Sequence, residues 1–223
     1  MAMSTAIARG HNPTDSSRKR RWRTPPAFFQ AMAEEHNFIL DAAAEPGAQL
    51  VRRYIAPPTA RLDHLAADQL PVGVDCLVTP WARQRTDRWS WFNSPWGPAF
   101  SQCPPDCTKA EKNPKHVHHT ESFPGTEAFM RAAIRNSALM RVLVLVSTCP
   151  DTAWWRAAFR ASFKVRLLPR VSFLDPDTGE EMGAPPGAGV TLFSMDAHNE
   201  WLPLPSFRPR VVLADKFGRI VPN

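Results

Sequence analysis

Four consecutive residues, Asn93-Ser94-Pro95-Trp96, carry groups that can hold an amino nitrogen. The Asn93 side-chain carbonyl and the Ser94 main-chain carbonyl both accept hydrogen bonds. Together they can bind an exocyclic amino group and draw electron density onto its nitrogen. Pro95 stiffens the loop, and the indole of Trp96 offers a stacking surface for a flipped-out base. This combination suits methyl transfer to an amino nitrogen of a nucleobase, although in isolation it also fits a proline-containing loop with a core tryptophan.

A second segment, Phe38–Ala44, reads as a short apolar strand that ends on a carboxylate, Asp41, and gives way to three alanines. The carboxylate can accept hydrogen bonds from a ribose or a charged amine, and alanines such as Ala43 let a ligand approach the backbone closely. This layout is typical of the cofactor edge of an α/β sheet. The alternative is an ordinary strand end followed by a helix cap.

A third segment, the polar insertion 101–125, holds two cysteines and three histidines. Cys103 and Cys107 are separated by three residues, so both thiolates can reach one tetrahedral Zn²⁺, which His116 and His118 would complete. His119 could replace His118. Zinc here would be structural, because amino methylation needs neither a Lewis acid nor an activated water. The alternative is a flexible loop with unpaired thiols.

The apolar pattern predicts the strands and helices that must position these segments. A helix is expected from Thr24-Pro25-Pro26 to about Asn37, since proline suits a first helical turn. Further helices are expected after the caps Thr126 and Asp151, and strands at 38–40, 89–93, 140–146, 171–174, 190–194 and 210–213. Strands that alternate with helices predict an α/β domain with a mainly parallel sheet and helices on both faces. The last strands could add antiparallel strands at one edge.

Positive charge is concentrated at the N-terminus. The chain of 223 residues has a formal net charge of +6, and residues 1–23 hold six basic residues and one acidic residue. We therefore expect residues 1–21 to form a disordered basic arm ahead of one domain, 22–223. Because phosphate contacts release counterions, such an arm favours a polyanionic partner. A solubilising tail is the alternative.

Composition excludes several other classes of protein. With 43% hydrophobic residues the chain can bury a full core, which excludes a wholly disordered protein. The longest near-continuous apolar stretch, Met140–Val146, is too short to span a bilayer, and the N-terminus lacks the apolar region of a secretory signal. Four cysteines are too few for a disulfide scaffold. We expect a cytoplasmic protein without a membrane partner.

Taken in order, these segments resemble the phage-type DNA adenine-N6 methyltransferases. Trp22–Phe29 is similar to the family's opening Trp-x-Thr-Pro-Pro-x-Leu/Phe-Phe, and Phe38–Ala44 to its hydrophobic-Leu-Asp-Val-Ala-Ala. Asp75-Cys76-Leu77 with Trp81 resembles Asp-Ala-Leu…Trp, and Asn93–Trp96 occupies the place of Asn/Asp-Pro-Pro-Tyr/Phe/Trp. The likeness covers roughly residues 22–194, and four weak motifs in the right order are fairly specific.

The resemblance implies a Rossmann-like fold that uses S-adenosylmethionine to methylate adenine in DNA, in a bacterial or phage-infected cell. Thr24 and Pro25 would shape the methionine end of the cofactor site, and Asp41 with Ala43 would contact the cofactor. Asn93, the Ser94 carbonyl and Pro95 would form the target-amine site, and Trp96 would stack on the base. Together these positions form the candidate site.

One departure keeps alternatives open: Ser94 stands where the family has its first proline. The loop loses rigidity, although its carbonyl remains. A non-catalytic nucleic-acid-binding protein with a degraded methyltransferase fold would explain that change. Asn93 in first place favours adenine, but methylation of cytosine N4, of RNA or of a protein amide uses the same kind of loop.

Overall fold

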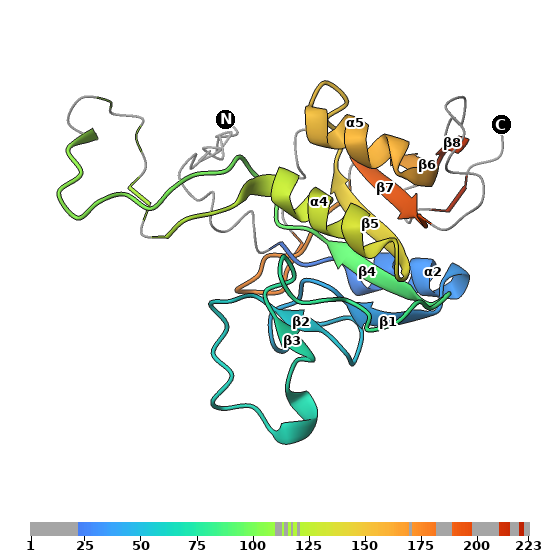
Figure 1. Cartoon of the computed structure of the whole chain (residues 1–223), viewed down its shortest axis with the longest axis horizontal. Coiled ribbons are helices and arrows are strands. Elements are labelled where there is room, and N and C mark those ends of the chain that lie inside the picture. Colours follow the sequence, from blue (N-terminus) through green and yellow to red (C-terminus); the bar gives the residue numbers. More distant parts are fainter. Residues whose placement is uncertain are drawn as a thin grey trace, which may run out of the picture.

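The computed structural model describes residues 22–109, 113, 116, 118, 119, 121–169, 171–181, 189–197, 210–214 and 219–220. The expected arm, 1–21, lies outside these residues. Six strands form one sheet in the order β1-β4-β5-β7-β6-β8, and a two-stranded sheet, β2-β3, lies beside β1 (Figure 1). Within the described part of the chain, no helix is long and apolar enough to cross a membrane.

The sheet is mainly parallel, as predicted. Its strands are β1 (Phe38–Asp41), β4 (Trp89–Asn93), β5 (Arg141–Ser147), β6 (Ser162–Leu168), β7 (Val190–Met195) and β8 (Arg210–Leu213), and the small sheet holds β2 (Ile55–Ala56) and β3 (Gly73–Val74). The strand pairs β1–β4, β4–β5 and β6–β8 are parallel, whereas β7 is antiparallel to both β5 and β6. Antiparallel pairing is therefore central, not at an edge as expected.

Helices cover both faces of the sheet, which confirms the predicted layers. The helices are α2 (Pro26–Glu35), α4 (Gly125–Asn136) and α5 (Ala153–Arg160), with a short 3-10 helix, η1, at Ala67–Gln69. Alternate residues of β5 point to opposite sides: Val142 and Val144 pack in the cluster that includes α4 and α5, and Leu143 and Leu145 pack in the cluster that includes α2. A strand buried on both faces explains the continuous apolar run in the sequence.

One expected strand is wrong, and one observed strand was not expected. The segment 171–174 is not a strand, because only Leu174 pairs, in isolated bridges with Arg23 and Glu181. Conversely, the apolar pattern does not predict β6, because Lys164 and Arg166 interrupt that pattern.

The helix caps also lie one or two residues away from the expected ones. Pro25, not Thr24, occupies the cap position of α2, and Pro124, not Thr126, occupies that of α4. For α5 the cap is Thr152, not Asp151, because the Thr152 side chain accepts the hydrogen bond of a first-turn amide.

A partly buried ion pair links α2 to β6. Arg166 is fully buried, and its guanidinium donates to both carboxylate oxygens of Glu35, with 2.8 Å between Nη1 and Oε1. Burial raises the pKa of Glu35, but its hydrogen bond to Arg166 and the charge of that residue outweigh burial, so the pKa lies below its usual value. The Glu35 side chain is 35% exposed, whereas that of Arg166 is not exposed at all.

We expect Glu35→Gln to destabilise the fold more than Arg166→Met. The first change leaves a buried guanidinium without its carboxylate, which costs about 3–5 kcal/mol in a fully buried pair and less here, because water reaches the Glu35 side. The second leaves a carboxylate that water can reach and fills the vacated space with an apolar chain. Urea unfolding would measure both changes against Glu34→Gln, an exposed position one residue earlier. Equal free energies of unfolding for the two pair variants would contradict this asymmetry.

Candidate active site

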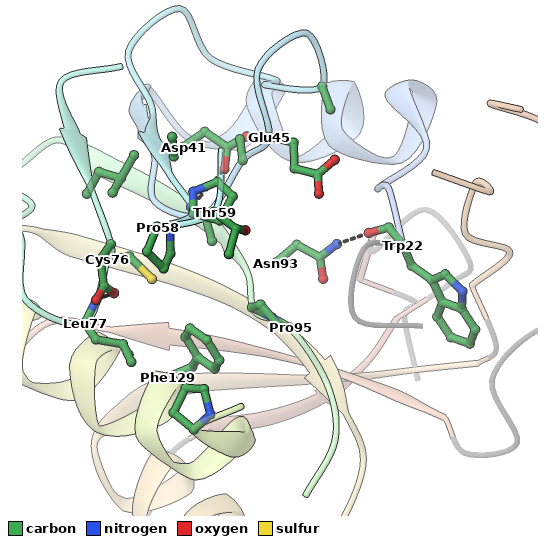
Figure 2. A pocket seen from close by; sticks show the side chains of 18 of the residues that line it. Trp22, Asp41, Glu45, Pro58, Thr59, Cys76, Leu77, Asn93, Pro95 and Phe129 are labelled. Atoms are coloured by element: carbon green, nitrogen blue, oxygen red, sulfur yellow. Dashed lines mark hydrogen bonds between the residues drawn. The ribbon is translucent and has the colours of Figure 1, made fainter. Parts of the chain in front are cut away.

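A cavity of about 350 Å³ lies at the carboxyl ends of β1 and β4 (Figure 2). Strand β1 pairs with β4 on one side, and on the other side Asp41 N–H donates to Arg53 O at 2.9 Å and Ala44 N–H to Ile55 O at 3.1 Å. The strand order thus reverses at β1. The crevice outside the carboxyl ends of strands at such a point is the usual ligand site of an open α/β sheet.

Most of the predicted site residues meet in this cavity. Thr24, Asp41, Ala43, Asn93 and Pro95 line it, from the start of α2, the end of β1 and the end of β4. These segments are far apart in sequence, so the fold brings the two chemical motifs to one place. The other predicted residues of the site, namely Pro25, Ser94 and Trp96, are not among the lining residues.

Asp41 lines the cavity and is buried, with 3% exposure. Its Oδ2 accepts the Leu50 N–H at 3.0 Å and its Oδ1 accepts the Ala43 N–H at 3.5 Å. Burial raises the pKa of Asp41 to about 6, although these two hydrogen bonds lower it. Asp41 therefore both closes the 41–50 loop and offers a carboxylate whose protonation changes near neutral pH.

The amide of Asn93 has a fixed orientation. Its Nδ2 donates to the Trp22 carbonyl at 3.1 Å, an interaction visible as the dashed line in Figure 2. Because the donor end is occupied, the Oδ1 end is the one left to accept a hydrogen bond from a ligand in the cavity. Trp22 directly precedes the Thr24 segment, so the asparagine and the start of α2 are tied together.

The other three residues of the predicted loop, 94–96, lie in different environments. Pro95 lines the cavity, whereas Ser94 is buried and its hydroxyl finds no hydrogen-bond partner among the described residues. The Trp96 indole packs edge-on against Trp22 and Phe173, at ring-centroid distances of 5.8 and 4.9 Å. Trp96 thus supports the Trp22 side of the site through packing, and it is not part of the cavity wall.

The first turn of α4 holds this loop in place. Gly97 N–H donates to Thr126 Oγ1 at 2.9 Å, and Thr126 N–H donates back to Gly97 O at 3.0 Å. Gly125 has a φ of +81°, and a Cβ there would meet the Ala99 backbone nitrogen at 2.7 Å. A side chain at this position would therefore force the loop away from the helix.

Sequence reasoning missed several lining residues. Trp22 lies in the opening motif without a role implied by the resemblance, and Asp75 lies in the Asp-Cys-Leu motif; both line the cavity. Asp75 has a φ of +63° and its Oδ1 accepts the Leu77 N–H at 2.9 Å, which shapes the turn after β3. Glu45 and Glu121 also line the cavity, and the only sequence signal for them is their charge.

The cavity lining is acidic: it holds four carboxylates and one cation, so it favours a positively charged ligand.

The four residues predicted to bind zinc also lie together. One ligand atom from each of Cys103, Cys107, His116 and His118 falls within 4.8 Å of the others. The His119 ring instead stacks on Phe100 with 3.8 Å between ring centroids. Of the two neighbouring histidines, the structure therefore places His118 in the group.

Comparison with known proteins links this geometry to one family. Residues 11–216 match the family model described as DNA N-6-adenine-methyltransferase (Dam). No curated protein matches. Two solved structures are distantly similar: a type I restriction-modification methyltransferase subunit from Streptococcus thermophilus (14% identity, TM-score 0.43) and a protein from Listeria monocytogenes assigned to the class I S-adenosylmethionine-dependent methyltransferases (12% identity, TM-score 0.41). The matches cover 87% and 86% of this chain, which spans only 47% and 65% of the two proteins.

Proposed function

Because the chain belongs to the DNA N-6-adenine-methyltransferase (Dam) family, we propose that it transfers a methyl group from S-adenosylmethionine to the N6 amino group of adenine in DNA. The family match confirms the resemblance predicted from the sequence, and the mainly parallel sheet with helices on both faces agrees with the predicted Rossmann-like methyltransferase fold. S-adenosylmethionine is the cofactor that this family and this fold imply. The observation that carries the proposal is the meeting of a buried carboxylate, Asp41, and a fixed amide acceptor, Asn93, in one cavity.

The residues of the cavity fit this cofactor. Its volume of about 350 Å³ lies in the range of small-molecule sites, and its acidic lining suits the sulfonium and ammonium charges of the cofactor. Bound S-adenosylmethionine supplies an electrophilic methyl group. Asp41 would accept hydrogen bonds from the cofactor, while Ala43 would leave room beside the backbone. Thr24, which is buried on the cavity wall, and the adjacent Pro25 would bound the methionine end.

Asn93 and Ser94 would hold the target amine. The Asn93 Oδ1 would accept a hydrogen bond from one N–H of the amine, which raises electron density on the nitrogen. The Ser94 main-chain carbonyl would accept one from the other N–H after a shift of the loop, because Ser94 is buried and does not line the cavity. Catalysis would then depend on alignment of the nitrogen with the methyl group and on stabilisation of the positive charge that develops on the amine, not on a strong base. Trp96 would position Trp22, which lines the cavity, by packing against it. After a change of rotamer, Trp96 would instead stack directly on the base.

The product of the reaction tests the proposal. The purified protein is incubated with methyl-labelled cofactor and unmethylated DNA, and the nucleosides are then separated after digestion. Labelled N6-methyladenine is the expected product. N4-methylcytosine would move the protein to the cytosine-N4 class, and cofactor binding without any transfer to DNA would favour the non-catalytic alternative.

Deletion of residues 1–21 should weaken DNA binding without unfolding the domain. The described domain begins at Trp22, and the deleted segment holds five basic residues and one acidic residue. Because the shortened chain neutralises fewer phosphates, the dependence of log K on log salt should become shallower by about 0.9 per phosphate on duplex DNA. Fluorescence anisotropy with one duplex at several salt concentrations measures this slope. An unchanged slope would show that the arm does not bind DNA.

A further inference from the structure

The chain between the Asn93–Trp96 loop and α4 forms two arms that pair through their backbones. Phe100 and Phe123 exchange both main-chain hydrogen bonds, at 2.9 and 2.8 Å, and Cys103 N–H donates to His119 O at 2.8 Å. In Figure 1 this green segment extends away from the sheet, beyond the first turn of α4. We call the described residues of this segment, 98–109, 113, 116, 118, 119 and 121–124, the projection. Such an extension has little apolar material of its own, so its shape needs another source of stability.

The group of two thiols and two imidazoles lies between these arms. The outgoing arm carries Cys103 and Cys107, and the His116 Nε2 lies 3.5 Å from each of the two sulfur atoms. Zinc bonds of about 2.3 Å to sulfur and 2.0–2.1 Å to nitrogen, at tetrahedral angles, place S and N about 3.6 Å apart. The observed spacing is therefore close to that of ligands already arranged around one ion.

The surrounding backbone supports the same arrangement. A tight turn, closed by Cys107 N–H to Pro104 O at 3.1 Å, brings the two cysteines to one side. Cys103 Sγ also accepts the His119 N–H at 3.3 Å, and hydrogen bonds from surrounding groups orient the ligands of a metal site. The His119 ring is engaged with Phe100, which leaves His118 as the fourth ligand.

We infer that the projection holds one structural Zn²⁺ bound by Cys103, Cys107, His116 and His118. Four protein ligands complete a tetrahedron, so the ion would have no open position for a substrate or a water. Its effect would be mechanical. The returning arm carries Glu121, Phe123 and Pro124 to the cavity wall, and Phe123 pairs directly with Phe100 on the outgoing arm. A metal clamp beyond this pair would fix one wall of the cavity.

The zinc content of protein purified without an affinity tag tests the site. We expect one zinc ion per chain by native mass spectrometry and elemental analysis. The double variant Cys103→Ser with Cys107→Ser should lose the ion, and His118→Ala should lose it or release it readily to a chelator. Two matched controls should keep it: His119→Ala, the neighbouring histidine, and Cys149→Ser, a half-buried cysteine outside the group.

Cobalt gives a second readout that does not depend on methyl transfer. Wild-type protein loaded with Co²⁺ should show thiolate-to-metal charge-transfer absorption, and the double cysteine variant should not. If that variant fails to fold, chelation of the wild-type protein replaces it: removal of zinc should open the projection to proteolysis, and added zinc should restore protection. The proposal fails if wild-type protein takes up no zinc when zinc is supplied, or if the double cysteine variant retains it. Either failure leaves the proposed methyl transfer untouched.

Discussion

We expect Asn93→Ala to slow methyl transfer by about 10²–10³, while the affinity for S-adenosylmethionine stays close to that of the wild-type protein. The variant lacks the fixed side-chain acceptor at the end of β4, which is oriented by its 3.1 Å bond to the Trp22 carbonyl. Removal of one preorganised polar group at a reacting centre typically costs about 10²–10³ in kcat. Single-turnover transfer of labelled methyl measures the rate, and calorimetry measures cofactor affinity separately.

Ser94→Pro is the matched control, because it changes the next residue of the same loop to the proline that the family has at this position. The Ser94 residue is 2% exposed and its hydroxyl has no partner among the described residues, so an apolar ring should be tolerated there. We expect this variant to keep its activity. Methylation by Asn93→Ala at the wild-type rate would remove Asn93 from the mechanism.

We expect Asp41→Ala to weaken cofactor binding by about 1.5–3 kcal/mol, which corresponds to roughly a tenfold to hundredfold increase in Kd. The variant loses a buried carboxylate that faces the cavity and also loses the anchor of the Leu50 amide. Asp41→Asn separates these effects, because an amide oxygen can still accept the Leu50 hydrogen bond but carries no charge. Cofactor affinity equal to wild type in both variants would show that Asp41 only shapes the loop.

The raised pKa of Asp41 adds a pH dependence with two opposite signs. If the cofactor needs the ionised carboxylate, affinity should fall below pH 6, by up to tenfold for each pH unit, and Asp41→Asn should show no such dependence. Stability behaves oppositely. Because the folded-state pKa of about 6 lies above the usual value of 3.8, the native state holds the proton more tightly. The contribution of Asp41 to stability is therefore fully present below pH 3.8 and is lost as the pH rises through 6.

The parts of the site that depend on local sequence were predictable. A strand that is buried on both faces, such as β5, appears in the sequence as an unbroken apolar run. The carboxylate of Asp41 and the amide of Asn93 indicate from their residue types alone which hydrogen bonds they can make. The group of thiols and imidazoles was predictable for the same reason, since short spacing along the chain limits which atoms can meet.

What could not be predicted depends on contacts between distant segments. Strand β6 carries Arg166, whose charge is balanced by Glu35 from the distant helix α2. The orientation of Trp96 is decided by Phe173 and Trp22, which no local pattern brings together. The interior position of β7 likewise depends on the order in which the strands pair, and neither the hydrophobic periodicity nor the strand propensity of the sequence encodes that order.

The interior position of β7 also limits how much of the sheet can fold while the chain is still being synthesised. Because β7 follows β6 in sequence but lies between β5 and β6, a nascent chain that ends after β6 has no strand to join those two elements. Val142 pairs with Met195 and Ser147 with Val190, so β5, a strand with five buried apolar residues in a row, keeps an open edge until late in synthesis. Long-range pairing of this kind folds slowly, and an unpaired apolar edge recruits other chains. Ribosome-bound or truncated chains that stop before residue 190 should therefore aggregate unless a chaperone covers β5, whereas chains that include β7 can complete the central sheet.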